Sequence, residues 1–478
     1  MQNGSPRCET RQKGKVLGLH QFPTLPLSRM DRQESVGRFE KGVAPLAEIR
    51  VIGGGLAGAE AAYYLLKKGY DVHLFEARPS YSDGAHETDL FGELVCSNSL
   101  KSKQLTNACG LLKEEMRHLG SLMMEASDAS EVPSGNALGV DRELFARYIT
   151  DKLNSFPNLH VHREEVTSLP DDGILTILAT GPLTSPALLE DLSQKIGQKN
   201  LSFFDASAPI VKKSSIDFSK AYFKSRYDQD DGSYINCPFT KDEYYALVRE
   251  LLGAQKALLH EFDTHYFEGC LPVEVIASRG GETLRHGPLK PFGLETPEHP
   301  KPYAVVQLRQ DTKLGDYYNI VGFQTNLTYP EQKRVFSMIP GLEHAEFLRY
   351  GLMHRNSYID APRVLQNDLS LKTHPSVFVA GQLSGVEGYV ESAAMGILCA
   401  IHASRRLEGK PFVKIPRETI YGGLVSYLLH AEGKYFQPMN ANWALIPGAR
   451  KENRDACIQS SLKAIQSFVE EIEDHGRE

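Results

Sequence analysis

The sequence has no uninterrupted apolar run near the roughly 18 residues of a membrane-spanning helix, because Lys, Glu or His interrupts its most apolar segments. No membrane association is therefore expected. The first 47 residues are rich in Arg, Gln, Ser and Pro and lack the apolar core of a signal peptide, so secretion is not supported. We expect residues 1–47 to be a disordered tail, or the chain to start at Met30, and the protein to be cytoplasmic.

The sequence also has no CxxC pair among its seven cysteines and no histidine at the spacing of a metal partner, so we expect no metal site. The odd number of cysteines suits a reducing compartment, where thiols stay free. The formal net charge of −7 argues against a strongly cationic, non-specific nucleic-acid binder, although a local basic face remains open.

A glycine-rich turn near residue 53 is the first motif with a chemical meaning. A strand is predicted at 48–52, a helix at 59–68 and a second strand at 71–75, which together form a βαβ unit. The turn between strand and helix reads GGGLAG, a GxGxxG pattern in which backbone N–H groups and the helix dipole can hold a pyrophosphate. Glu76 ends the second strand, where an acidic residue can accept hydrogen bonds from ribose hydroxyls. The predicted dinucleotide site comprises Gly53, Gly54, Gly55, Leu56, Ala57, Gly58 and Glu76.

A strand-turn-helix pattern late in the sequence favours FAD over NAD as the bound dinucleotide. The segment VFVAG at 377–381, followed by Gly385 and Gly388, is similar to the segment that brings a helix beside the flavin ring in two-part flavin folds. Gly381 is therefore added to the predicted cofactor-binding residues. A plain strand-to-helix turn is the alternative reading.

The length of 478 residues exceeds what one hydrophobic core usually organises, so one unit is expected to be inserted into another. We predict an α/β fold: a Rossmann-type FAD-binding domain formed by residues 48–205 and 327–415, with a smaller inserted α+β domain at 206–326, a stretch rich in Tyr, Phe and Pro. Residues 416–478 are predicted to form a C-terminal helical segment.

Four further runs are not generic flavoprotein sequence. They read GELVCSNSLK at 92–101, FEGCLPVE at 267–274, TLRHGPLKP at 283–291 and HRNSY at 354–358. In this order they resemble the folate- and FAD-dependent tRNA (uracil-5-)-methyltransferases of bacteria, and the likeness extends from about residue 48 to 409.

The resemblance implies a specific chemistry. Carbon 5 of uracil is a poor nucleophile, and a thiolate that adds to carbon 6 turns it into an enolate. The resemblance assigns this attack to Cys270 and a partner role to Cys96. It implies FAD as cofactor, 5,10-methylenetetrahydrofolate as methylene donor, NAD(P)H as reductant and a T-loop uridine of tRNA (position 54) as acceptor. It implies no stable protein partner.

Several alternatives remain open at this stage. The same chemistry on ribosomal RNA, the larger wobble-uridine flavoproteins, a flavin-holding RNA-binding protein without methyl transfer and a small-molecule flavin oxidoreductase share parts of the pattern. Cys109 and Cys399 lie on apolar helix faces, which favours core packing. Cys237 stands in loop-like sequence, but a catalytic role is not favoured there. The general base and the preferred nicotinamide are not predicted.

Overall fold

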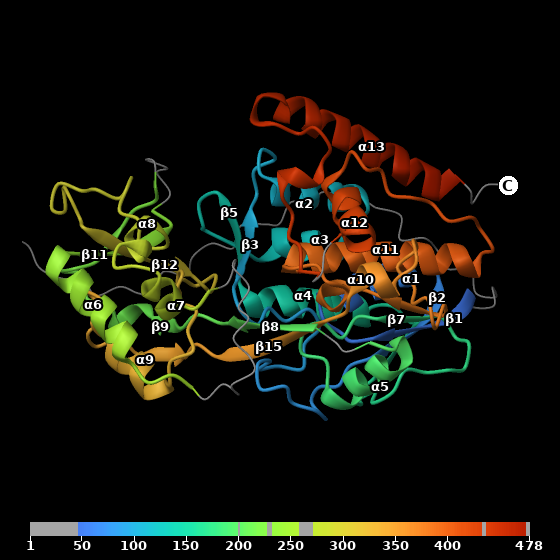
Figure 1. Ribbon diagram of the computed structural model, residues 1–478, viewed down its shortest axis with the longest axis horizontal. Coiled ribbons are helices and arrows are strands. Elements are labelled where there is room, and N and C mark those ends of the chain that lie inside the picture. Colours follow the sequence, from blue (N-terminus) through green and yellow to red (C-terminus); the bar gives the residue numbers. More distant parts are fainter. Residues whose placement is uncertain (1–45, 199–200, 227–231, 258–270, 433–435, 475–478) are drawn as a thin grey trace, which may run out of the picture. The chain divides into compact units, whose positions relative to one another are not determined.

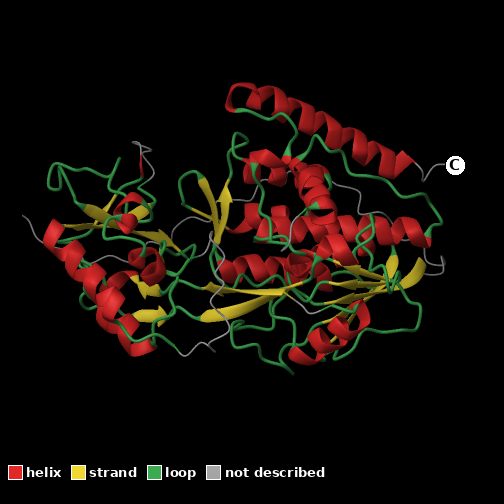
Figure 2. Ribbon diagram, in the orientation of Figure 1, coloured by secondary structure: helices red, strands yellow, loops and turns green. Residues whose placement is uncertain are grey.

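A five-stranded parallel sheet in the order β16-β7-β1-β2-β6 carries the glycine-rich turn at the end of its middle strand (Figures 1 and 2). The computed structural model describes residues 46–198, 201–226, 232–257, 271–432 and 436–474. They belong to one compact unit, Pro45–Glu478. The strands are β1 (Leu46–Ile52), β2 (Tyr70–Phe75), β6 (Leu159–His162), β7 (Thr176–Leu178) and β16 (Val377–Val379).

Two helices pack tightly on this sheet. Helix α1 (Leu56–Lys67) connects β1 to β2, so the predicted βαβ unit is present, and α11 (Tyr389–Leu407) follows β16. Gly396 of α11 lies so close to the backbone of Ala57 that a Cβ atom would overlap its carbonyl oxygen. Through this contact α11, which comes late in the chain, packs directly against α1 of the first βαβ unit. In Figure 1, α1 and α11 lie on one side of the sheet and α5 (Pro186–Ile196) on the other.

The remaining elements of this part, which we call the Rossmann unit, surround these layers. Among them is a small sheet in the order β3-β5-β4. No helix in the described part of the chain is both long and apolar enough to cross a bilayer. The elements are β3 (Ser99–Ser102), α2 (Ala108–His118), α3 (Leu122–Ser130), β4 (Glu131–Val132), β5 (Ala137–Val140), α4 (Arg142–Asn154), α10 (Ala361–Val364), η4 (Gly381–Ser384), α12 (Ile420–His430), η5 (Trp443–Leu445), η6 (Lys451–Asn453) and α13 (Arg454–Asp474).

A second, antiparallel sheet in the order β10-β11-β12-β13-β9-β14 forms the centre of what we call the inserted unit. Its hydrophobic side chains make a core of their own, separate from the core around α1 and α11. The elements are β9 (Ile210–Lys212), η1 (Lys213–Ser215), β10 (Tyr222–Phe223), β11 (Tyr234–Phe239), α6 (Lys241–Gly253), α7 (Val273–Ser278), α8 (Thr283–His286), β12 (Ala304–Gln310), β13 (Tyr317–Ile320), α9 (Tyr329–Phe336) and β14 (Phe347–Arg349).

The chain enters and leaves the inserted unit through two paired strands. β8 (Leu201–Ala206) runs antiparallel to β15 (Met353–Tyr358), in a register that pairs Met353 with Ala206. The second core includes side chains of α9, and Phe347 packs against it. The predicted boundary at residue 326 therefore cuts through this core. We propose that the inserted unit ends after β14 instead, because the second core continues through α9 as far as Phe347.

The prediction that Cys237 lies in a loop is wrong. It lies in β11, paired with Val306 of β12, and is fully buried in the second core. Burial raises the pKa of its thiol far above the ordinary value. The neighbouring Pro238 suggested a loop, yet it is accommodated within this strand. Cys109 and Cys399 are buried in helices, as predicted.

Candidate cofactor and active site

A cavity of about 440 Å³ extends from the glycine-rich turn to the start of α11. This volume lies within the range of small-molecule and cofactor sites. Its wall contains nearly all the predicted cofactor residues, and it also contains Cys96. The predicted residues that line it are Gly53, Gly54, Gly55, Leu56, Ala57, Glu76 and Gly381.

The glycine-rich turn has the backbone that its sequence demands. Gly53 has φ +103°, and a Cβ atom there would lie 2.5 Å from the Ala179 carbonyl oxygen. A Cβ on Gly54 would lie 2.5 Å from the Phe91 ring. A Cβ on Gly58, which packs behind the turn rather than lining the cavity, would overlap the Gly53 carbonyl oxygen. These three glycines are therefore required by the packing of the turn itself.

Gly55 is different, because apart from its neighbours in the chain no protein atom lies within 4 Å of the position of its missing Cβ. It precedes α1 as the N-cap, and no side chain caps the first N–H groups of that helix. Uncapped N–H groups at a helix start attract anions, particularly phosphate. The space beside Gly55 and the uncapped helix fit the pyrophosphate of a dinucleotide.

Glu76 is already engaged within the chain. Its carboxylate accepts hydrogen bonds from Gly54 N at 2.9 Å and from Arg78 N at 3.0 Å, and it pairs with the Arg78 guanidinium at 2.9 Å. Burial raises the pKa of Glu76, but the charge and hydrogen bonds of Arg78 and the hydrogen bond from Gly54 together hold the pKa below its ordinary value. A ribose hydroxyl would have to share this carboxylate with the turn. Glu76 therefore fixes the glycine-rich turn, whatever it contributes to a ribose.

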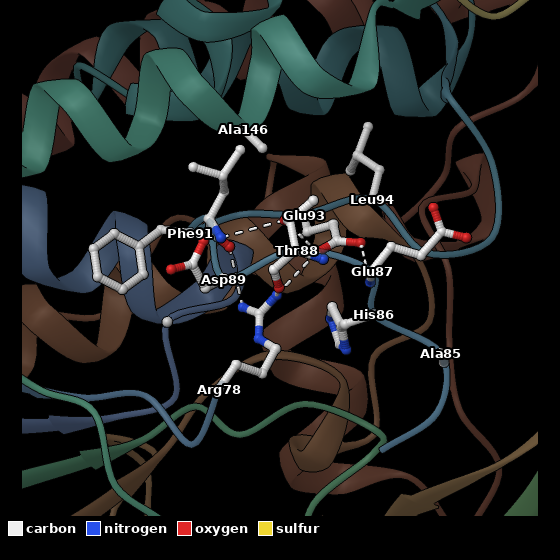
Figure 3. Close-up of polar contacts among 12 residues, drawn as sticks. Arg78, Ala85, His86, Glu87, Thr88, Asp89, Phe91, Glu93, Leu94 and Ala146 are labelled. Atoms are coloured by element: carbon white, nitrogen blue, oxygen red, sulfur yellow. Dashed lines mark hydrogen bonds and ion pairs between the residues drawn. The ribbon is translucent and has the colours of Figure 1, made fainter. Parts of the chain in front are cut away.

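Arg78 also organises the long loop that follows (Figure 3). Its guanidinium donates to the carbonyl oxygens of Thr88 and Leu90 at 3.0 and 3.1 Å and pairs with Glu93 at 3.0 Å. The Glu93 carboxylate in turn accepts hydrogen bonds from the backbone of Glu87 and Thr88. The segment between β2 and β3 thus has a defined shape without regular secondary structure.

Cys96 lies at the end of the cavity nearest α11, on the loop before β3. Its backbone N–H and that of Ser97 donate to the Tyr389 hydroxyl oxygen at 2.7 and 3.2 Å. Its Sγ lies 3.6 Å from Asp205 Oδ2. The thiol is partly exposed, unlike the core cysteines. It is therefore placed to contact a ligand in the cavity.

Charged side chains surround this end of the cavity. Burial raises the pKa of Glu387 well above its ordinary value, and the neighbouring charge of Asp205 adds to the rise. Lys101 Nζ lies 3.0 Å from Glu391 Oε1. Burial alone lowers the pKa of Lys101, but the Glu391 carboxylate raises it above its ordinary value. Glu391 Oε2 is buried and has no hydrogen-bond partner among the described residues, so it can accept one from a bound ligand.

Cys270, the predicted nucleophile, lies outside the described residues. The chain is described again from Leu271 onward, where α7 packs into the second core through Val273. The sequence did not indicate Tyr389 or Asp205, because each contacts Cys96 from a distant part of the chain. It did not indicate Arg78 either, because the partners of Arg78 lie in an irregular loop that has no periodic pattern. Within the described residues, no cluster of three or more His, Cys, Asp or Glu side chains is arranged to hold a metal ion.

Comparisons with known proteins identify the family of the chain. The family model for "Glucose inhibited division protein A" matches residues 48–411. The Methylenetetrahydrofolate--tRNA-(uracil-5-)-methyltransferase TrmFO of Lactobacillus delbrueckii subsp. bulgaricus is 51% identical over 437 residues, covering 89% of this chain and 99% of that protein. A protein of the same name from Listeria monocytogenes serotype 4b is 51% identical over 432 residues, with the same shares covered.

Among solved structures, the form I crystal of Aquifex aeolicus GidA superposes with a TM-score of 0.66 at 18% identity, covering 90% of this chain and 76% of that chain. This likeness concerns the fold alone, and it confirms the predicted α/β class. The sequence relatives confirm the resemblance that the four motifs carried. The chain therefore belongs to the glucose inhibited division protein A family and, within it, to the methylenetetrahydrofolate--tRNA-(uracil-5-)-methyltransferases.

Proposed function

We propose that this protein transfers the methylene of 5,10-methylenetetrahydrofolate to carbon 5 of a T-loop uridine in tRNA and reduces it to a methyl group with FADH2, using NAD(P)H as reductant. The observation that carries this proposal is the 51% identity to a protein named for that reaction, across 99% of its length. The cavity supports it, because a dinucleotide turn and a partly exposed thiol share one wall.

FAD would be held at both ends of the cavity by residues of the Rossmann unit. The turn Gly53–Gly58 and the start of α1 suit the pyrophosphate, and Gly381 with the start of α11 suits the flavin end. A Cβ on Gly381, whose φ is +72°, would lie 2.9 Å from the Ala57 Cβ, so this turn must stay small. When bound, FAD supplies the hydride that completes the methyl group.

The two thiols have separate proposed roles. The Cys270 thiolate adds to carbon 6 of uracil, and the resulting enolate forms a bond from carbon 5 to the methylene. A base then removes the proton from carbon 5 as the bond from the methylene to its carrier nitrogen breaks, which releases the carrier and leaves an exocyclic methylene with sulfur still on carbon 6. Hydride adds to this methylene as the bond from sulfur to carbon 6 breaks, which gives 5-methyluridine and frees the thiolate. Cys96, on the cavity wall, handles the methylene or the proton.

Loss of the nucleophile is expected to abolish methyl transfer. The full-length protein, NADPH, FAD, unmodified tRNA and methylenetetrahydrofolate with a labelled methylene are incubated, and labelled 5-methyluridine is measured after digestion. Cys270→Ala is expected to lower the rate by at least about a thousandfold. Cys237→Ala is the matched control, since this cysteine is buried in the second core and is expected to keep most of the activity.

Each outcome separates one part of the proposal. Label in tRNA from both Cys270→Ala and the wild type would keep the reaction and remove Cys270 as nucleophile. Label in ribosomal RNA instead of tRNA would change the substrate and keep the chemistry. Absence of label from every RNA would overturn the proposed function.

A further inference from the structure

Arg142, the first residue of α4, makes hydrogen bonds to the loop that carries Cys96. Its Nη1 donates to the carbonyl oxygens of Leu94 and Val95 at 3.0 and 3.2 Å. Its Nη2 is buried and has no hydrogen-bond partner among the described residues. The Arg142 guanidinium thus contacts the two residues that precede Cys96 and keeps one buried nitrogen that no described residue accepts from.

The inserted unit supplies the counter-charge to this arginine. Arg142 Nε lies 3.2 Å from Oδ1 of Asp311, and both side chains are largely buried. Nearby, Asn98 Nδ2 donates to the Gln310 carbonyl oxygen at 2.8 Å, and Arg309 Nε donates to Asn98 Oδ1 at 2.9 Å. The end of β12 therefore docks against the Cys96 loop through polar and charged contacts.

The polar and charged groups around Cys96 and Ser97 come from several elements. Asp205 of β8 lies against its Sγ, Tyr389 of α11 accepts from its N–H, and Arg309 of β12 donates to the Ser97 hydroxyl oxygen at 2.9 Å. Arg142 interacts electrostatically with Cys96 as well as with Asp311. Burial lowers the pKa of Arg142, but Asp311 raises it above its ordinary value, so this guanidinium stays charged. Asp205 opposes a thiolate, whereas Arg142 favours it.

We propose that Arg142 is a positioning residue for Cys96, that its charge favours the Cys96 thiolate, and that Asp311 of the inserted unit limits this effect. The inserted unit thereby adjusts the reactivity of a thiol that belongs to the Rossmann unit. This inference rests on the proposed role of Cys96 as a functional thiol. It is tested without methyl transfer, so its failure and the failure of the proposed function can be told apart.

The test measures alkylation of Cys96 by iodoacetamide in the full-length protein with FAD bound, from pH 6 to pH 9, and quantifies the Cys96 peptide by mass spectrometry. Arg142→Met keeps the aliphatic bulk and removes the charge. At pH 7 it is expected to slow alkylation about tenfold and to move the rising limb of the profile to higher pH. Arg142→Lys, which restores the charge, is expected to recover part of the rate.

Asp311→Asn is the decisive second variant, because it breaks the same ion pair from the other side. The proposal requires it to speed alkylation and to move the profile to lower pH. A loop that is merely loosened would respond in the same direction to Arg142→Met and Asp311→Asn, and that result would overturn the proposal. An unchanged profile in Asp311→Asn would overturn it too, even if Arg142→Met does not fold.

Discussion

Replacing Gly55 by valine is expected to prevent the protein from retaining FAD while leaving its fold intact. Gly55 has φ −71° and ψ −168°, an extended conformation that valine accepts readily. The Cβ of the new side chain has open space around it, and the side chain enters the cavity at the start of α1, where the pyrophosphate would lie. FAD affinity is expected to fall by at least about a hundredfold, measured by titrating the apoprotein and following flavin fluorescence.

The control for this substitution is Gly253→Val, at the end of α6. Gly253 also has open space at its missing Cβ, but it lies outside the cavity wall. The melting temperatures of both apoproteins are expected to match that of the wild-type apoprotein. Normal FAD affinity in Gly55→Val would show that the pyrophosphate does not bind at the glycine-rich turn.

Glu115→Ala is expected to lower the free energy of unfolding by about 3 to 5 kcal/mol. Glu115 of α2 is fully buried, and its two carboxylate oxygens accept from Ile420 N and Tyr421 N, each at 2.9 Å. Ser461 of α13 donates to the same carboxylate at 2.6 Å. Alanine leaves these donors without a partner at the start of α12. Urea unfolding measures the loss, and a change below about 1 kcal/mol would contradict it.

The pH dependence of stability gives a second test of the same carboxylate. Burial raises the pKa of Glu115 from 4.5 to about 7, against the opposing effect of its hydrogen bonds. Between pH 4.5 and about pH 7, the Glu115 carboxyl is protonated in the native state but has lost its proton in the unfolded state. The stability that Glu115 contributes is therefore fully present below about pH 4.5 and is lost as the pH rises through about 7. Glu60, whose pKa burial also raises to about 7, acts in the same direction. Glu115→Gln is expected to reduce this decline, whereas a wild-type stability that increases from pH 5 to pH 8 would contradict the assignment.

The sequence predicted the first βαβ unit to within a few residues, because local patterns determine it. Periodicity placed the strands, and glycines marked the turn, where a Cβ at Gly53, Gly54 or Gly58 would collide with backbone or ring atoms. The predicted helix at 59–68 begins earlier in the structure, at Leu56, because Gly55 already serves as the N-cap. The C-terminal helices were also predicted from periodicity and appear as α12 and α13.

Features that depend on contacts distant in the sequence were not predicted. Glu115 shows no local pattern that reveals its partners in α12 and α13, and the pairing of Arg142 with Asp311 joins two separate units. The hairpin of β4 and β5 was missed because its strands are short. The end that we propose for the inserted unit rests on such contacts as well, because Val335 and Phe336 of α9 pack into the second core.

The order of the strands also constrains when the protein can acquire its cofactor during synthesis. A nascent chain that has passed β14 holds every element of the inserted unit, which has its own core and can fold first. The cavity needs β16, which pairs with β7, and the start of α11, which closes its far end as far as Ser392. The complete FAD cavity therefore cannot form during synthesis before residue 392 has emerged from the exit tunnel.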